Sequence, residues 1–73
     1  MIYTLFALSS ITYAMKGKKL LNNLGYFAEV EKTPQGLASG CGYSLRIRDD
    51  PNYLSNILLS NGIEIKGRQQ INR

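Results

Sequence analysis

The residue with the most distinctive chemistry in this sequence is its single cysteine, Cys41, which stands between Gly40 and Gly42. A thiolate is a nucleophile, and a nearby helix N-terminus or basic group stabilises it by lowering the thiol pKa. The two glycines remove side-chain bulk and let neighbouring backbone N–H groups turn toward the sulfur as a small anion-binding nest. A second interpretation stays open, because a lone cysteine is often a small buried hydrophobe.

The composition excludes several classes of site. The 73 residues contain no histidine, which rules out histidine bases, histidine zinc ligands and Cys-His pairs within the chain. One cysteine cannot form an internal disulfide, so we expect a reducing, cytoplasmic location. Such a short chain buries only a thin core, and we expect no cofactor. The net charge of +4 is spread along the chain and does not demand nucleic acid.

The first half of the chain predicts a strand, a helix and a second strand. Residues 2–8 form an apolar run typical of a buried strand and too short to span a membrane. Ser9 or Ser10 can cap a helix that Gly25 then ends. The apolar residues of this helix near helical spacing are Ile11, Ala14, Met15, Leu21 and Leu24. Residues 26–32 partly alternate, which indicates a half-exposed strand.

The second half predicts two further strands around one helix. Residues 33–42 form a loop with one proline and three glycines, and residues 43–48 alternate cleanly as a strand. Asp50 is the expected N-cap before Pro51, which is why we interpret Asp49 and Asp50 as a helix start and not as metal ligands. Asn61 and Gly62 end that helix. Residues 63–67 form a short last strand, and the polar tail 68–73 is expected to fray.

This order predicts one α+β domain over residues 1–67 with the ferredoxin-like βαββαβ arrangement. Right-handed crossovers place the third strand between the first and second in a four-stranded antiparallel sheet, with both helices on one face. The loop before the third strand then reaches the edge where the first helix begins. We therefore expect Cys41 beside the helix start at Ser9 and Ser10, with Gly40, Gly42 and Arg46 completing a binding site.

Three segments of this chain resemble a known family. Residues 33–46, with Cys41-Gly42 after Thr33-Pro34, look like the signature loop of the selenium/sulfur carrier-like proteins, a family of small bacterial domains. Residues 6–10 and 62–65, with Ala14 and Leu20–Leu21, are similar to the same pattern. The resemblance implies that Cys41 holds sulfur or selenium as a persulfide or selenosulfide and passes it to a protein partner. It implies a carrier or binding domain and not a stand-alone enzyme.

The main alternative is an interaction or regulatory module without thiol chemistry. Its open sheet face or an edge strand would bind a protein partner or a second copy of the chain. The side chains expected on that open face are Thr4, Phe6, Ser44, Arg46 and Arg48. Domains that recognise RNA stack bases on such a face, but the third strand here offers serine and arginine in place of aromatic residues. We therefore do not expect nucleic acid as the partner.

Overall fold

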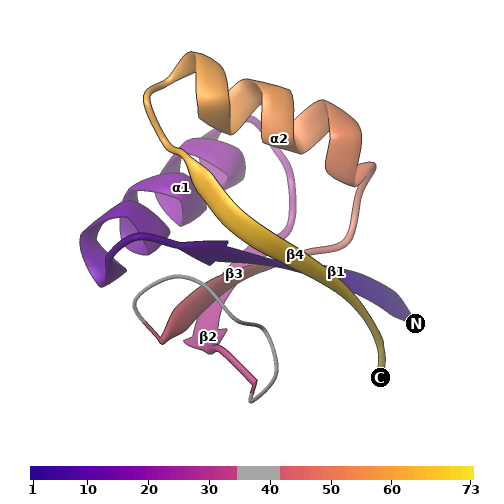
Figure 1. Ribbon diagram of the computed structural model, residues 1–73. Helices are drawn as coiled ribbons and strands as arrows, with labels where there is room; N and C mark the ends of the chain where they lie inside the picture. Colours follow the sequence, from indigo (N-terminus) through magenta and orange to yellow (C-terminus); the bar gives the residue numbers. More distant parts are fainter. Residues whose placement is uncertain (35–41) are drawn as a thin grey trace.

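The computed structural model of the protein describes residues 1–34 and 42–73 and contains four strands and two helices (Figure 1). In chain order they are β1 (Ile2–Leu8), α1 (Ile11–Asn23), β2 (Ala28–Lys32), β3 (Tyr43–Ile47), α2 (Pro51–Ser60) and β4 (Ile65–Asn72). This βαββαβ order confirms the predicted ferredoxin-like α+β fold. The second and third strands are shorter than the predicted ranges 26–32 and 43–48: β2 begins at Ala28, and β3 ends at Ile47.

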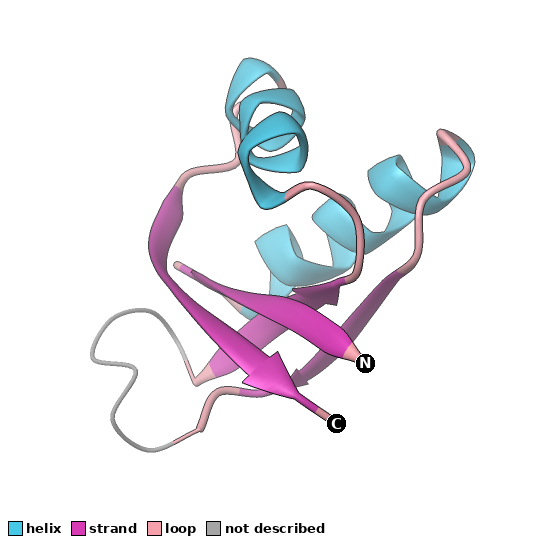
Figure 2. Ribbon diagram, turned by 90° about the vertical axis from the view of Figure 1, so that its right-hand side faces the viewer, coloured by secondary structure: helices cyan, strands magenta, loops and turns pink. Residues whose placement is uncertain are grey.

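The four strands form one antiparallel sheet in the order β2-β3-β1-β4. The third strand therefore lies between the first and second, as predicted. Both helices lie on one side of this sheet (Figure 2). In β1, Phe6 lies opposite Leu45 of β3 and opposite Arg68 of β4, so β1 is the strand that joins the two halves of the fold.

The helix boundaries follow from capping. Ser10 has extended backbone angles, and its side-chain oxygen accepts a hydrogen bond from the Tyr13 amide at 3.2 Å. Gly25, with φ of 90°, ends α1, because a left-handed conformation costs glycine no Cβ clash. In α2, the Asp50 carboxylate accepts from the Asn52 amide at 3.0 Å, ahead of Pro51 in the first turn. These caps confirm the predicted helix starts.

The buried side of α1 differs from the predicted one. Ala14, Gly17 and Leu21 are buried, whereas Ile11, Met15 and Leu24 are 43%, 61% and 53% exposed. The reason is close packing at Gly17. A Cβ atom there would lie 3.1 Å from Leu45 Cδ2 and 3.3 Å from Leu58 Cδ2. Gly17, which weakens the helix locally, thus lets α1 approach the sheet and α2 closely.

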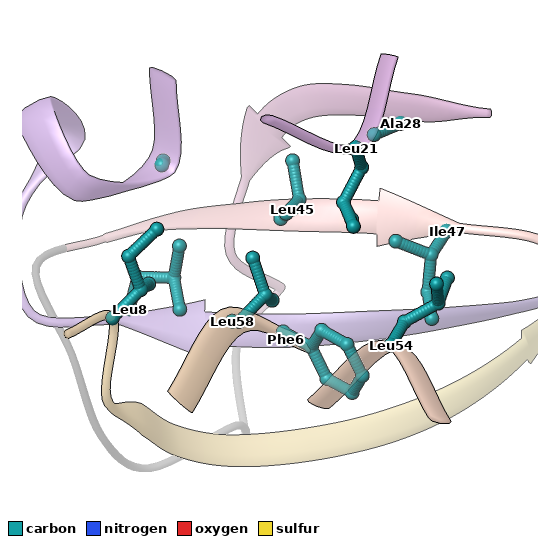
Figure 3. Packing of buried hydrophobic residues seen from close by; sticks show 10 residues of the cluster. Phe6, Leu8, Leu21, Ala28, Leu45, Ile47, Leu54 and Leu58 are labelled. Atoms are coloured by element: carbon teal, nitrogen blue, oxygen red, sulfur yellow. The ribbon is translucent and has the colours of Figure 1, made fainter. Parts of the chain in front are cut away.

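The hydrophobic core lies between the sheet and the helices and is built from aliphatic side chains around one phenylalanine (Figure 3). Phe6 and Leu8 of β1 point into it, as do Leu45 and Ile47 of β3. Since successive side chains of a strand point to opposite faces, Thr4 lies on the same side as Phe6. The prediction that Thr4 and Phe6 lie on the open face was therefore wrong.

The last strand is longer than the sequence indicated. β4 pairs with β1 along its length, from Leu8 opposite Ile65 to Ile2 opposite Asn72. The prediction of a strand over 63–67 and a fraying tail was wrong, because residues 68–72, all polar except Ile71, complete the sheet. The irregularity between Ala7 and Leu8 leaves Lys66 as an extra residue in β4.

Candidate functional site

Two hydrogen bonds join the ends of the segment that contains Cys41. The Thr33 amide donates to the Gly42 carbonyl at 2.8 Å, which extends the β2–β3 pairing by one residue. The Thr33 and Ser44 hydroxyls share a second hydrogen bond of 2.7 Å. Ser44 lies on the predicted face of β3, alternating with the core residue Leu45, but it is fully buried there. Its hydroxyl instead closes the base of the loop together with Thr33.

The loop base lies at the end of the sheet where α1 begins. Ala7 of β1 is opposite Ser44 of β3, and the two strands are antiparallel. Ser9 comes two residues after Ala7, and Gly42 comes two residues before Ser44, so both lie at the same end of the sheet. Ser10 comes next and caps α1. The structure therefore places three of the predicted site residues at one end of the sheet: Ser9, Ser10 and Gly42.

Gly42 has a specific backbone reason to be glycine. Its φ is 94°, in the region that residues with a Cβ rarely adopt. A Cβ atom there would meet no other atom within 4 Å, so the constraint comes from the backbone and not from crowding. Gly40 and Cys41 lie outside the described residues. The expected position of Cys41 beside α1 stays a prediction.

The start of α1 provides a positive field at this end of the sheet. The Ser10 side chain satisfies the Tyr13 amide, and its carbonyl accepts from the Ala14 amide at 3.1 Å. No acidic residue stands in the first turn of α1 to offset the partial positive charge of the helix N-terminus. This end of the sheet is therefore suited to stabilising a negatively charged group.

Arg46, the last of the six predicted site residues, has a different environment. It lies opposite Leu5 and Glu29, four residues along β3 from Gly42, which is about 13 Å in an extended strand. Its guanidinium pairs with Glu31 at 3.3 Å and lies 4.9 Å from the centre of the Tyr3 ring. The described contacts place Arg46 within the sheet face away from the helices and not at the Ser9–Gly42 end.

A cluster of charged and aromatic side chains lies on that second face. We call it the arginine cluster, and its members are Tyr3, Phe27, Glu31, Arg46 and Arg73. Arg73 donates to both oxygens of Glu31, at 3.0 and 2.7 Å, and this hydrogen bonding raises the pKa of Arg73. Leu5, the register partner of Arg46, is fully buried on this side. The face expected to be open is thus closed to solvent at Leu5.

Sequence reasoning missed this cluster because it assigned Arg73 to a fraying tail. One signal was available: Glu29 and Glu31 alternate on β2 with the same period as Ser44, Arg46 and Arg48 on β3. Opposite charges at matching positions of neighbouring strands indicate pairing across the sheet. Arg48 is exposed, as predicted, and its guanidinium lies 5.0 Å from the centre of the Phe27 ring.

Comparison with known proteins gives a family but no characterised relative. Neither α1 nor α2, the helices in the described part of the chain, is long and apolar enough to cross a membrane. No curated protein and no solved structure matches the sequence. A protein-family model described as "Putative Se/S carrier protein-like" matches residues 3–68, which covers most of the chain and confirms the resemblance of the loop. The protein therefore belongs to this selenium/sulfur carrier-like family.

Proposed function

We propose that the protein holds a sulfur or selenium atom on the thiol of Cys41 and hands it to a partner enzyme. The family supports a carrier role in general terms. The observation that carries the specific proposal is the loop base. The bonds from Thr33 to Gly42 and Ser44 bring the residue next to Cys41 to the end of the sheet where α1 starts.

The transfer needs no oxidant or metal. The Cys41 thiolate attacks the outer sulfur of a donor persulfide, forming a new S–S bond as the donor's S–S bond breaks and the donor leaves as a thiolate. A nucleophile of the acceptor then attacks the outer sulfur on Cys41. That step returns Cys41 to a thiolate, ready for another cycle. Because each step starts from a thiolate, the proposal sets the protein in a reducing compartment such as the cytoplasm.

The described residues have distinct parts in this proposal. Ser10 caps the amide-rich start of α1 at the same end of the sheet as the loop base, and Gly42 supplies the positive-φ residue that precedes β3. The helix field favours the thiolate over the thiol and so increases the nucleophile available at neutral pH. Arg46 is engaged by Glu31, and we give it no direct part in the transfer.

Mass spectrometry of the intact protein tests the carrier role. Protein purified without reductant and incubated with a small-molecule persulfide donor should gain the mass of one sulfur atom. Cys41→Ser, which leaves the chain without a thiol, should gain none. The loaded protein should return to its starting mass when an acceptor thiol is added. A Cys41 thiol that an alkylating reagent reaches only after unfolding would overturn the proposal, because a buried sulfur cannot be handed on.

A matched pair of charge variants tests the position of Cys41. Thr12→Glu places a carboxylate in the first turn of α1, and Asn52→Glu places one at the corresponding position of α2. The first should slow alkylation of Cys41 at neutral pH by about two- to fivefold, by cancelling part of the helix field. The second should leave the rate unchanged. Equal alkylation rates in the two variants would show that Cys41 does not lie near the N-terminus of α1.

A further inference from the structure

The two outer strands of the sheet differ in how well they could pair with a second copy of themselves. β2 and β4 are the edges, and neither has a second neighbouring strand within residues 1–34 and 42–73. An edge strand exposes unpaired backbone N–H and C=O groups, which another extended chain can bind. β4 spans eight residues without proline or acidic residues, and β2 spans five.

The hydrogen bonds at the start of β1 fix which backbone groups of β4 face outward. Met1 and Arg73 exchange two backbone hydrogen bonds, of 2.9 and 2.6 Å. Since bonded and non-bonded pairs alternate along antiparallel strands, Gln69 and Ile71 bond to β1. The residues between and beside them, Arg68, Gln70 and Asn72, therefore direct their backbone groups away from the sheet.

We propose that two copies of the chain pair through β4 in antiparallel register, with Gln69 opposite Gln69 of the second copy. The outward groups of Arg68 then meet those of Gln70 from the second copy, so each arginine lies opposite a neutral amide. A shift that centres the pair on Arg68 would oppose two arginines, and a shift toward Gln70 would shorten the pairing. The Gln69 register is the longest one free of like-charge pairs.

The side chains around β4 are compatible with this contact. Lys66 pairs with Glu64 at 3.2 Å, and Arg68 donates to the Asn52 side chain at 3.1 Å, so both cations are held by neighbours within their own copy. Leu59 of α2 is 64% exposed and lines a hollow of about 270 Å³ beside Ile65 and Arg68. It offers apolar surface next to the pairing strands.

β2 is unsuited to the same arrangement. Centring two β2 strands on Val30 places Glu29 opposite Glu31 of the second copy. Centring them on Glu29 or on Glu31 places identical carboxylates together. Because bonded and non-bonded pairs alternate, a symmetric pair of strands is centred on a residue, and each such register of β2 with at least three paired residues opposes like charges. The charges thus select β4 as the edge that binds a second copy.

Sedimentation across a range of concentrations tests the dimer and its edge. Wild-type protein should associate as a dimer. Gln70→Lys, which opposes Arg68 of the second copy, should weaken association about fivefold, and Gln70→Glu should strengthen it about fivefold. Lys32→Pro removes an outward amide from β2 and should change nothing, whereas Gln70→Pro removes one from β4 and should abolish the dimer. A monomer at all concentrations, or a dimer lost only in Lys32→Pro, would overturn the proposal.

Crosslinking tests the register and is independent of the carrier chemistry, since it uses the Cys41→Ser background. Directly opposed, non-bonded residues in antiparallel strands have Cα atoms about 4.5 Å apart, within the range that a disulfide spans. Gln69→Cys should therefore form a disulfide-linked dimer on mild oxidation. Gln70→Cys should not form one, because residue 70 lies opposite Arg68 of the second copy and therefore two positions away from residue 70 of that copy. Equal crosslinking at both positions would contradict the register.

Discussion

The two faces of this sheet are closed by different chemistry. On one side, α1 and α2 bury an aliphatic core around Phe6, and Gly17 lets the helix lie close to the sheet. On the other, Glu31 joins Arg46 and Arg73 of the arginine cluster, and Leu5, the register partner of Arg46, is fully buried. The first face gains stability from shape and apolar burial, and the second from charge pairing that water and salt can weaken.

The largest expected effect comes from the helix-covered face. Leu45→Ala removes a fully buried side chain that contacts the position of Gly17 and should lower the free energy of unfolding by about 2–5 kcal/mol. Gly17→Ala alone should lower it by about 1 kcal/mol, because crowding outweighs the better helix propensity of alanine. Chemical denaturation of the purified variants measures both values.

Combining the two changes tests whether Gly17 is there for close packing. In the Leu45→Ala background, the methyl group of Gly17→Ala enters space that Leu45 vacated, so the second substitution should become stabilising by about 1 kcal/mol. Ile47→Ala is the control background, because Ile47 lies on the same side of β3 but is not among the atoms closest to Gly17. If Gly17→Ala changed the free energy of unfolding in the same direction in both backgrounds, the packing explanation would be refuted.

The sequence predicted the features that depend on local chemistry. Caps at Ser10 and Asp50 and the stops at Gly25 and Gly62 depend on neighbouring residues only, and all appear in the structure. It failed where packing between distant segments decides.

The hydrophobic spacing of α1 suggested that Met15 is on its buried side, but packing against β3 and α2 buries the side that holds Gly17. The tail at 68–72 is polar, yet pairing with β1 makes it a strand. Of the candidate site, the placement of Ser9, Ser10 and Gly42 followed from topology. The hydrogen bond of Thr33 to Ser44 depends on strand register, which the sequence pattern did not specify.

The arginine cluster should give an intermediate effect. Glu31→Gln removes the charge that Arg46 and Arg73 share while keeping the side-chain shape, and leaves the half-buried Arg46 without its partner. We expect a loss of about 1–2 kcal/mol in unfolding free energy, smaller at high salt because ions screen the pairing. Denaturation at low and high salt measures both.

Glu29→Gln is the matched control on the same strand. Its partner is Lys18, at 3.2 Å, and both side chains are more exposed, at 48% and 41%. An exposed pair of this kind contributes less than about 1 kcal/mol. If the two glutamine variants lost equal stability, the cluster around Glu31 would be ordinary surface charge and the contrast between the faces would fail.

The smallest expected effect concerns a tyrosine pair on the helix-covered side. The rings of Tyr26 and Tyr53 meet edge-to-face with centres 6.1 Å apart. Hydrogen bonding to Tyr53, followed by burial and by the negative charges of Tyr53 and Asp49, raises the pKa of Tyr26 above its ordinary value.

A raised tyrosine pKa favours the folded state below the ordinary pKa of about 10, and this contribution is lost as the pH rises through the folded-state pKa. Tyr53→Phe removes the neighbouring hydroxyl and should bring the Tyr26 pKa down toward its ordinary value, as followed by tyrosine absorbance during an alkaline titration. Its stability should differ from wild type at neutral pH and converge with it at strongly alkaline pH. Tyr13→Phe, which removes an exposed hydroxyl from α1, should leave the Tyr26 titration unchanged, and an unchanged titration in Tyr53→Phe would show that the pair does not couple.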